Sequence, residues 1–192
     1  MILNKKKRWE ILAELLKRKN IKPKVGAEIG ILAGNMTTKV LQQIPSIVKY
    51  YAIDPWEWYP SYMKSLRADS NFVKNMIKSK DTPQEKFDEK FEIFKQKTIQ
   101  FQNKIKILKM YSKEASEHIE DKSLDFLFID GNHGYEYVKE DIELYSPKIK
   151  RGCLIGGHDY GHVVGGVKEA VNEIFESEEI ILGGNSTWWV WV

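Results

Sequence analysis

The sequence predicts an α/β fold in which a doubly wound, mostly parallel sheet ends in an antiparallel C-terminal hairpin strand. Short apolar runs alternate with segments of helical character, which is the pattern of a parallel sheet. The first run passes through a glycine turn directly into a helix. The last two runs, 179–182 and 187–192, are separated by Gly183-Gly184-Asn185-Ser186, which favours a hairpin.

Length and composition indicate a single domain covering residues 1–192. With 30% charged residues and a net charge of +3, neither nucleic acid nor a membrane is expected as a partner. Cys153 is the one cysteine, which excludes an internal disulfide and a cysteine-rich zinc site. No run approaches about 18 apolar residues, and no apolar segment follows the basic N-terminus, so we expect a cytoplasmic protein.

The N-terminal segment, residues 5–19, predicts an amphipathic helix packed on the domain. Trp9, Leu12, Leu15 and Leu16 recur at helical spacing among lysines and glutamates. The run of basic residues 5–8 at its start is interpreted as a solvated helix end.

The glycine turn that follows the first strand is the central motif of the chain. It has the pattern Glu28-x-Gly30-x-x-x-Gly34 and leads into a helix. Gly30 and Gly34 have no Cβ, so a ligand can approach the main chain closely there. A dinucleotide motif has a further glycine where this chain has Leu32. Glu28 would repel a phosphate, whereas it suits the ammonium of an amino-acid group.

The second strand, 47–53, ends at an acid that faces the same crevice in a doubly wound sheet. Asp54 lies 20 residues after Gly34, where a carboxylate can accept both hydroxyls of a ribose. Trp56, two residues later, is placed to pack its ring on adenine.

Residues 56–103 form an insertion that is longer than the helix a minimal βαβ unit requires. It begins with clustered aromatic residues and continues as a charged helix, 84–102, with phenylalanines on one side. One interpretation is a lid or a wall of the substrate site. The other is that the aromatic side chains only fix the extra helix to the domain.

Polar residues also follow the remaining parallel strands. Met110-Tyr111-Ser112 follows the strand 104–109, Asp130 ends the strongly apolar run 124–130, and His158-Asp159 follows the strand 153–157. Ligands of open α/β sheets bind at the carboxyl ends of the strands. These residues therefore predict a site at this edge of the sheet.

Asp130, His158 and Asp159 end neighbouring strands and form a candidate site for Mg²⁺ or Mn²⁺. Such an ion would lower the pKa of a substrate hydroxyl. The alternative is that Asp130 caps a loop and that His158 and Asp159 form an ordinary hydrogen-bonded pair. His133, in a loop with Gly131 and Gly134, is a candidate general base near neutral pH.

The order of these motifs resembles the class I S-adenosylmethionine-dependent methyltransferases of the methyltransferase family 24 type, which have a Rossmann-like seven-stranded sheet. The most specific parts are Ile129-Asp130-Gly131-Asn132-His133-x-Tyr135 and Gly157-His158-Asp159. The resemblance implies that Glu28 and Gly30 hold the methionine end of the cofactor, Asp54 the ribose, and Met110, Tyr111 and Ser112 the adenine. Related catechol-type and macrolide-sugar enzymes carry metal ligands where Asp130, His158 and Asp159 stand, although a histidine at the second position departs from their pattern.

The sequence therefore predicts an S-adenosylmethionine-dependent O-methyltransferase that acts on a hydroxyl of a small molecule or a sugar, with Asp130 or His133 taking the proton. A nucleic-acid methyltransferase is disfavoured because the chain has no Asp-Pro-Pro-Tyr type motif and no proline before Cys153. A non-catalytic interaction module using the aromatic segment 56–72 stays open, as does a nicotinamide oxidoreductase, which the missing glycine weakens. A homo-oligomer is compatible with the sequence.

Overall fold

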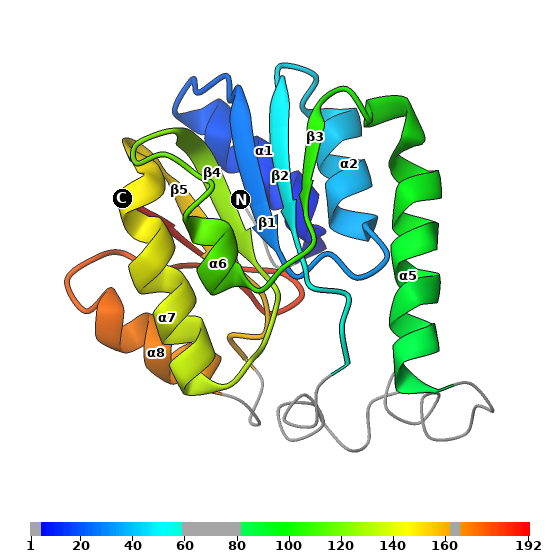
Figure 1. The fold of residues 1–192 in the computed structure, drawn as a ribbon. Helices are drawn as coiled ribbons and strands as arrows, with labels where there is room; N and C mark the ends of the chain where they lie inside the picture. Colours follow the sequence, from blue (N-terminus) through cyan, green and yellow to red (C-terminus); the bar gives the residue numbers. More distant parts are fainter. Residues whose placement is uncertain (1–4, 59–81, 162–165) are drawn as a thin grey trace.

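The computed structural model describes residues 5–58, 82–161 and 166–192, which form a seven-stranded sheet with helices on both faces (Figure 1). The strand order is β3-β2-β1-β4-β5-β7-β6. Strands β1 to β5 are parallel to one another, whereas β7 runs antiparallel to both β5 and β6. The predicted α/β class, with its C-terminal antiparallel hairpin, is confirmed. The strands are β1 Val25–Ile29, β2 Lys49–Ile53, β3 Ile105–Leu108, β4 Leu124–Ile129, β5 Ile149–Gly157, β6 Ile181–Gly183 and β7 Thr187–Trp191.

The helices divide between the two faces of the sheet. In Figure 1, α6 and α7 lie in front of the strands, and α1 and α2 lie behind them. The first predicted helix begins at Arg8 rather than at residue 5, because Lys7 has extended backbone angles and acts as the N-cap. None of the helices in the described ranges is both long and apolar enough to span a bilayer. Their bounds are α1 Arg8–Arg18, α2 Asn35–Gln43, α5 Pro83–Thr98, α6 Ser112–Ser116, α7 Tyr135–Tyr145 and α8 Val167–Ile174, with short 3₁₀ turns at Ile99–Phe101 and Ser146–Lys148.

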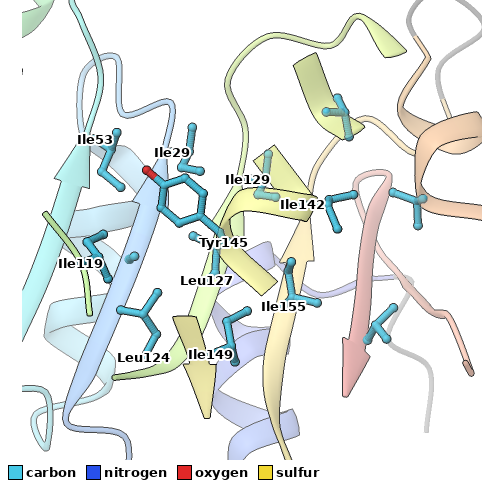
Figure 2. Packing of buried hydrophobic residues seen from close by; sticks show 14 of the residues in the cluster. Ile29, Ile53, Ile119, Leu124, Leu127, Ile129, Ile142, Tyr145, Ile149 and Ile155 are labelled. Atoms are coloured by element: carbon cyan, nitrogen blue, oxygen red, sulfur yellow. The ribbon is translucent and has the colours of Figure 1, made fainter. Parts of the chain in front are cut away.

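Strand β4 is buried along its whole length because it carries apolar side chains on both faces. Leu127 and Ile129 point to the face covered by α6, α7 and α8, and Figure 2 shows them among Tyr145 of α7 and the isoleucines of the neighbouring strands. Phe126 and Phe128 point to the opposite face, where they pack with α1, α2 and Trp189 of β7. The alternation of the strand thus fixes a helical layer on each side.

The described part of the insertion is the helix α5. Thr82 caps its first turn in a reciprocal pair with Glu85, and Pro83 occupies the first helical position. Phe94 of this helix stacks on Trp56 with a ring-centroid distance of 5.3 Å. These contacts fix α5 to the domain, and the interpretation of the insertion as a lid or a wall of the substrate site stays a prediction. The lid interpretation concerns mainly residues 59–81, which lie outside the described ranges.

Candidate active site

A cavity of about 600 Å³ opens at the carboxyl ends of β1, β2, β3 and β4, where the sequence predicted a site. Its floor is the glycine turn after β1, and its walls come from the ends of the neighbouring strands and from α1, α2, α5 and α7. Predicted site residues that line the cavity are Glu28, Gly30, Asp54, Tyr111, Ser112, Asp130 and His133.

Close packing around Gly30 and Gly34 fixes the backbone path of the glycine turn. Gly30 has a φ of +85°, and a Cβ there would lie 2.2 Å from the carbonyl oxygen of Asp130. The residue therefore must be glycine for the ends of β1 and β4 to meet. Gly34, the N-cap of α2, has a φ of +68°, and a Cβ there would lie 2.4 Å from the Phe94 ring. Gly34 packs against α5 rather than lining the cavity, contrary to the prediction of ligand contact.

Leu32 occupies the position of the missing motif glycine and nevertheless has a left-handed backbone, with a φ of +50°. Asp54 holds this conformation. Its Oδ2 atom accepts hydrogen bonds from the backbone N–H groups of Ile31 and Leu32, both at 2.9 Å. Its Oδ1 atom accepts one from Trp56 N–H at 2.7 Å. Burial raises the pKa of Asp54, although these three bonds oppose the shift.

Trp56 does not have the position expected for an adenine-stacking ring. The side chain is fully buried, and its Nε1–H donates to the Leu32 carbonyl at 2.8 Å. Phe91 and Phe94 of α5 cover the ring. The prediction assumed that a ring two residues after Asp54 would face the cavity. A left-handed φ of +45° at Trp56 turns the ring into the core instead.

Glu28 lies on the cavity wall although it is almost completely buried. The hydroxyls of Thr37 and Tyr50 donate to its Oε2 atom at 2.6 and 2.7 Å. Burial raises the pKa of the Glu28 carboxyl to about 7, and the two hydrogen bonds only partly oppose this shift. The group therefore changes its charge near neutral pH.

One end of the cavity, near β3, is aromatic and acidic. Tyr111 and Ser112 line it as predicted, whereas Met110 packs against the core on the α6 and α7 side. Tyr137 and Asp141 of α7 complete this end, one helical turn apart on the same face. Burial raises the pKa of Asp141 to about 7, while a hydrogen bond from Ser112 opposes the shift.

The other end, at the carboxyl ends of β4 and β5, carries a cluster of charged and imidazole groups. The Asp159 Oδ2 atom lies 3.0 Å from His133 Nε2 and 3.0 Å from His158 Nδ1. Asp130 Oδ1 lies 3.6 Å from His158 Nδ1, and Arg8 of α1 forms an ion pair with Asp130 Oδ2. Burial alone would lower the pKa of His158, but the hydrogen bond to Asp159 and the charges of Asp130 and Asp159 raise it.

The loop that carries His133 is held by its own side chains and by the chain before α8. Asn132 accepts the Gly134 N–H at 2.9 Å through its side chain, and the His133 carbonyl accepts the Gly166 N–H at 2.8 Å. Asp159 has a left-handed backbone with a φ of +61°, which aims its carboxylate back at the imidazoles. Aspartate adopts this backbone more readily than most non-glycine residues.

The donor set of this cluster fits a divalent cation. Asp130, His133 and Asp159 each offer one ligand atom, and these atoms lie within 4.8 Å of one another. Two carboxylate oxygens and one imidazole suit Mn²⁺ or Mg²⁺. His133 thus joins the predicted ligands Asp130 and Asp159, while His158 lies beside them and contacts Asn185 through Nε2 at 3.1 Å.

Four residues of the cavity wall with ionisable side chains were not predicted from the sequence: Arg8, Glu57, Tyr137 and Asp141. Asp141 could have been noticed in the sequence, because it is an acid next to Ile142 on the otherwise apolar face of the predicted helix. Tyr137 lies four residues before Asp141, so the helical period would have placed both side chains on the same face. Arg8 left no local signal, since it pairs with a residue 122 positions away.

Comparison with known families agrees with this geometry. The methyltransferase family 24 model, described as a methyltransferase domain, matches residues 27–160. The chain belongs to this family. The matched residues of the methyltransferase domain contain the glycine turn, Asp54, Asp130, His133 and Asp159. The family resemblance inferred from the order of the motifs is thereby confirmed.

Solved structures show that the methyltransferase fold is shared with distant proteins. The O-methyltransferase NovP is 15% identical, with a TM-score of 0.63 over 96% of this chain and 77% of that chain. An O-methyltransferase from Bacillus cereus, solved with S-adenosylhomocysteine (SAH), is 11% identical, with a TM-score of 0.60 over 96% of this chain and 80% of that chain.

One relative is similar in sequence over a short stretch. The uncharacterized protein y4gI of Sinorhizobium fredii (strain NBRC 101917 / NGR234) is 39% identical over 54 residues, which are 28% of this chain and 6% of that protein.

Proposed function

We propose that this methyltransferase domain uses S-adenosylmethionine to methylate a hydroxyl oxygen of a small molecule or a sugar. The observation that carries the proposal is the cavity, whose wall has an aromatic and acidic end near β3 and, at its other end, Asp130 and His133 of the imidazole and carboxylate cluster. The first end suits an adenosine, and the second suits proton transfer from a hydroxyl. The two O-methyltransferases of the same fold support this choice.

In this proposal the cofactor lies along the strand ends from β3 to β4. Its methionine end would lie at Glu28 and Gly30, and its adenine at Tyr111, Ser112 and Asp141. Because Thr37 and Tyr50 both donate to the Oε2 atom of Glu28, an ammonium would be received by Oε1.

The ribose would lie at Asp54, but the carboxylate cannot accept both of its hydroxyls without losing a backbone bond. Each carboxylate oxygen has two lone pairs. Oδ2 already accepts two N–H groups and Oδ1 accepts one. One lone pair of Oδ1 remains for one hydroxyl. Glu57, an exposed acid on the cavity wall whose Oε2 is 3.3 Å from Tyr111 OH, is proposed to accept the other.

The cofactor supplies the methyl group, and the protein positions the acceptor and takes its proton. His133 Nε2 lies 3.0 Å from the Asp159 carboxylate, which stabilises the imidazolium formed when His133 accepts that proton. Asp130 and Asp159, with His133, would hold Mg²⁺ or Mn²⁺, and such an ion would lower the pKa of an acceptor hydroxyl. Where no ion is bound, Asp130 is the alternative proton acceptor.

Isothermal titration with SAH tests the cofactor assignment. We expect saturable binding, and a ligand concentration of 100 times the Kd should add about 2.7 kcal/mol to the free energy of unfolding. Transfer of a labelled methyl group to a panel of catechols, sugars and amines, with and without EDTA, then tests the acceptor class. Absence of SAH binding would refute the proposal, and labelling of amines or carbon atoms alone would refute O-methylation.

A further inference from the structure

Arg8 is the one arginine or lysine among the described residues that line the cavity. It comes from the first turn of α1, whereas most of the wall comes from the strand ends. The other ionisable groups on the wall are mostly carboxyls: Glu28, Asp54, Glu57, Asp130 and Asp141. A negatively charged part of a ligand would be repelled by most of this wall and attracted at Arg8.

The position of Arg8 is fixed by the packing of its helix. Ile11, Leu12, Leu15 and Leu16 of α1 are buried against the sheet. The Arg8 guanidinium carbon lies 5.7 Å from the centre of the Phe128 ring, and the guanidinium pairs with Asp130 Oδ2. The Arg8 and Asp130 side chains keep 21% and 18% of their surface exposed. This charge pair is therefore held at the cavity wall, where a ligand can reach both groups.

The pair is complementary to the amino-acid end of the proposed cofactor, which carries an ammonium and a carboxylate. Glu28 and Asp130 can receive the ammonium, whereas the carboxylate needs a cation or an N–H or O–H donor. We propose that Arg8 binds the carboxylate of the methionine portion, exchanging its bond to Asp130 for a bond to the ligand. This inference rests on the proposed function. The N-terminal turn of α2 is the competing receiver of the carboxylate, because its Asn35 and Met36 also line the cavity.

The test compares two ligands that differ in the amino-acid group. SAH carries the carboxylate, and 5′-methylthioadenosine keeps the adenosine and sulfur but lacks the carboxylate and the ammonium. Arg8→Met removes the charge and preserves much of the side-chain volume. Arg18→Met is the matched control, because Arg18 lies on the same helix and pairs with Glu14 outside the cavity wall. Titration calorimetry gives the Kd of each ligand for each protein variant, and competition titrations are used for weak ligands.

We expect Arg8→Met to weaken SAH binding by about 10- to 100-fold, because a charge-assisted hydrogen bond is lost. The Kd of 5′-methylthioadenosine should change by less than about threefold, which is under 1 kcal/mol. Arg18→Met should leave both values unchanged, and Arg8→Lys should recover part of the SAH affinity.

The outcomes separate this inference from the proposed function. If wild-type protein does not bind SAH, the proposed function fails. If wild-type protein binds SAH and Arg8→Met binds it equally well, the function stands and the carboxylate lies elsewhere, with the α2 turn as its receiver. If Arg8→Met weakens both ligands alike, Arg8 acts only by holding α1 in place, and the inference is again overturned.

Discussion

Replacing Glu28 by glutamine should make the protein more stable at high pH and change its stability little at low pH. The side chain is 2% exposed, and burial raises the pKa of its carboxyl from 4.5 to about 7. Glutamine keeps a carbonyl oxygen that can accept the bonds from Thr37 and Tyr50, and it cannot ionise. The substitution therefore removes the buried charge with little change in shape.

The size of the effect follows from the pKa shift. A folded-state pKa above the unfolded value means that the folded protein binds the proton more tightly, so this contribution to stability is lost as pH rises through about 7. At 1.36 kcal/mol per pKa unit, full ionisation of Glu28 costs about 3 kcal/mol. The cost is about 1 kcal/mol at pH 5 and nearly complete at pH 8.

Urea unfolding of wild-type protein and Glu28→Gln between pH 5 and 8 measures this cost. The difference in unfolding free energy should move by about 2 kcal/mol in favour of the variant as pH rises. Glu143→Gln, an exposed carboxyl on α7, controls for the loss of one negative charge. A difference that stays constant with pH, or that moves in favour of the wild type, would refute the reasoning.

Three further substitutions test other parts of the site. Asp54→Ala leaves the three backbone N–H groups of the glycine turn without their acceptor and should cost about 2–4 kcal/mol in urea unfolding; an unchanged midpoint would contradict the assigned role. Trp56→Phe loses the bond to the Leu32 carbonyl and should cost about 1–3 kcal/mol, while the Kd for SAH stays the same because the ring is away from the cavity. Asp159→Asn should weaken Mn²⁺ binding, followed by electron paramagnetic resonance, at least about tenfold; equal binding would exclude Asp159 as a ligand.

The residues whose location could be predicted from sequence are those that directly follow a strand. Asp54, Asp130 and Asp159 follow parallel strands, and the carboxyl ends of such strands meet at one edge of the sheet. The antiparallel hairpin could be predicted because its turn residues lie between two apolar runs. These inferences need only local patterns and the general geometry of parallel sheets.

Side-chain direction after a strand could not be predicted in the same way. Trp56 and Gly34 both lie close to ligand-facing residues in sequence, yet both belong to the contact with α5. That contact depends on a helix some 30 or more residues further along the chain. The location of Arg8 could not be predicted either. It belongs to a basic run that is expected to face water, and only the packing of α1 places it on the cavity wall.

The location of α1 and β7 bears on how the boundaries of this domain are drawn. Sequence similarity to the family covers residues 27–160, so α1 and β7 both lie outside the matched range. Yet α1 buries one face of the central strands, and Trp189 of β7 packs on Phe128 with a ring-centroid distance of 5.3 Å. A fragment cut at the limits of similarity would expose Phe126, Phe128 and Leu154 to water and would be prone to aggregate. Expression of this domain should therefore start before Arg8 and include the last strand.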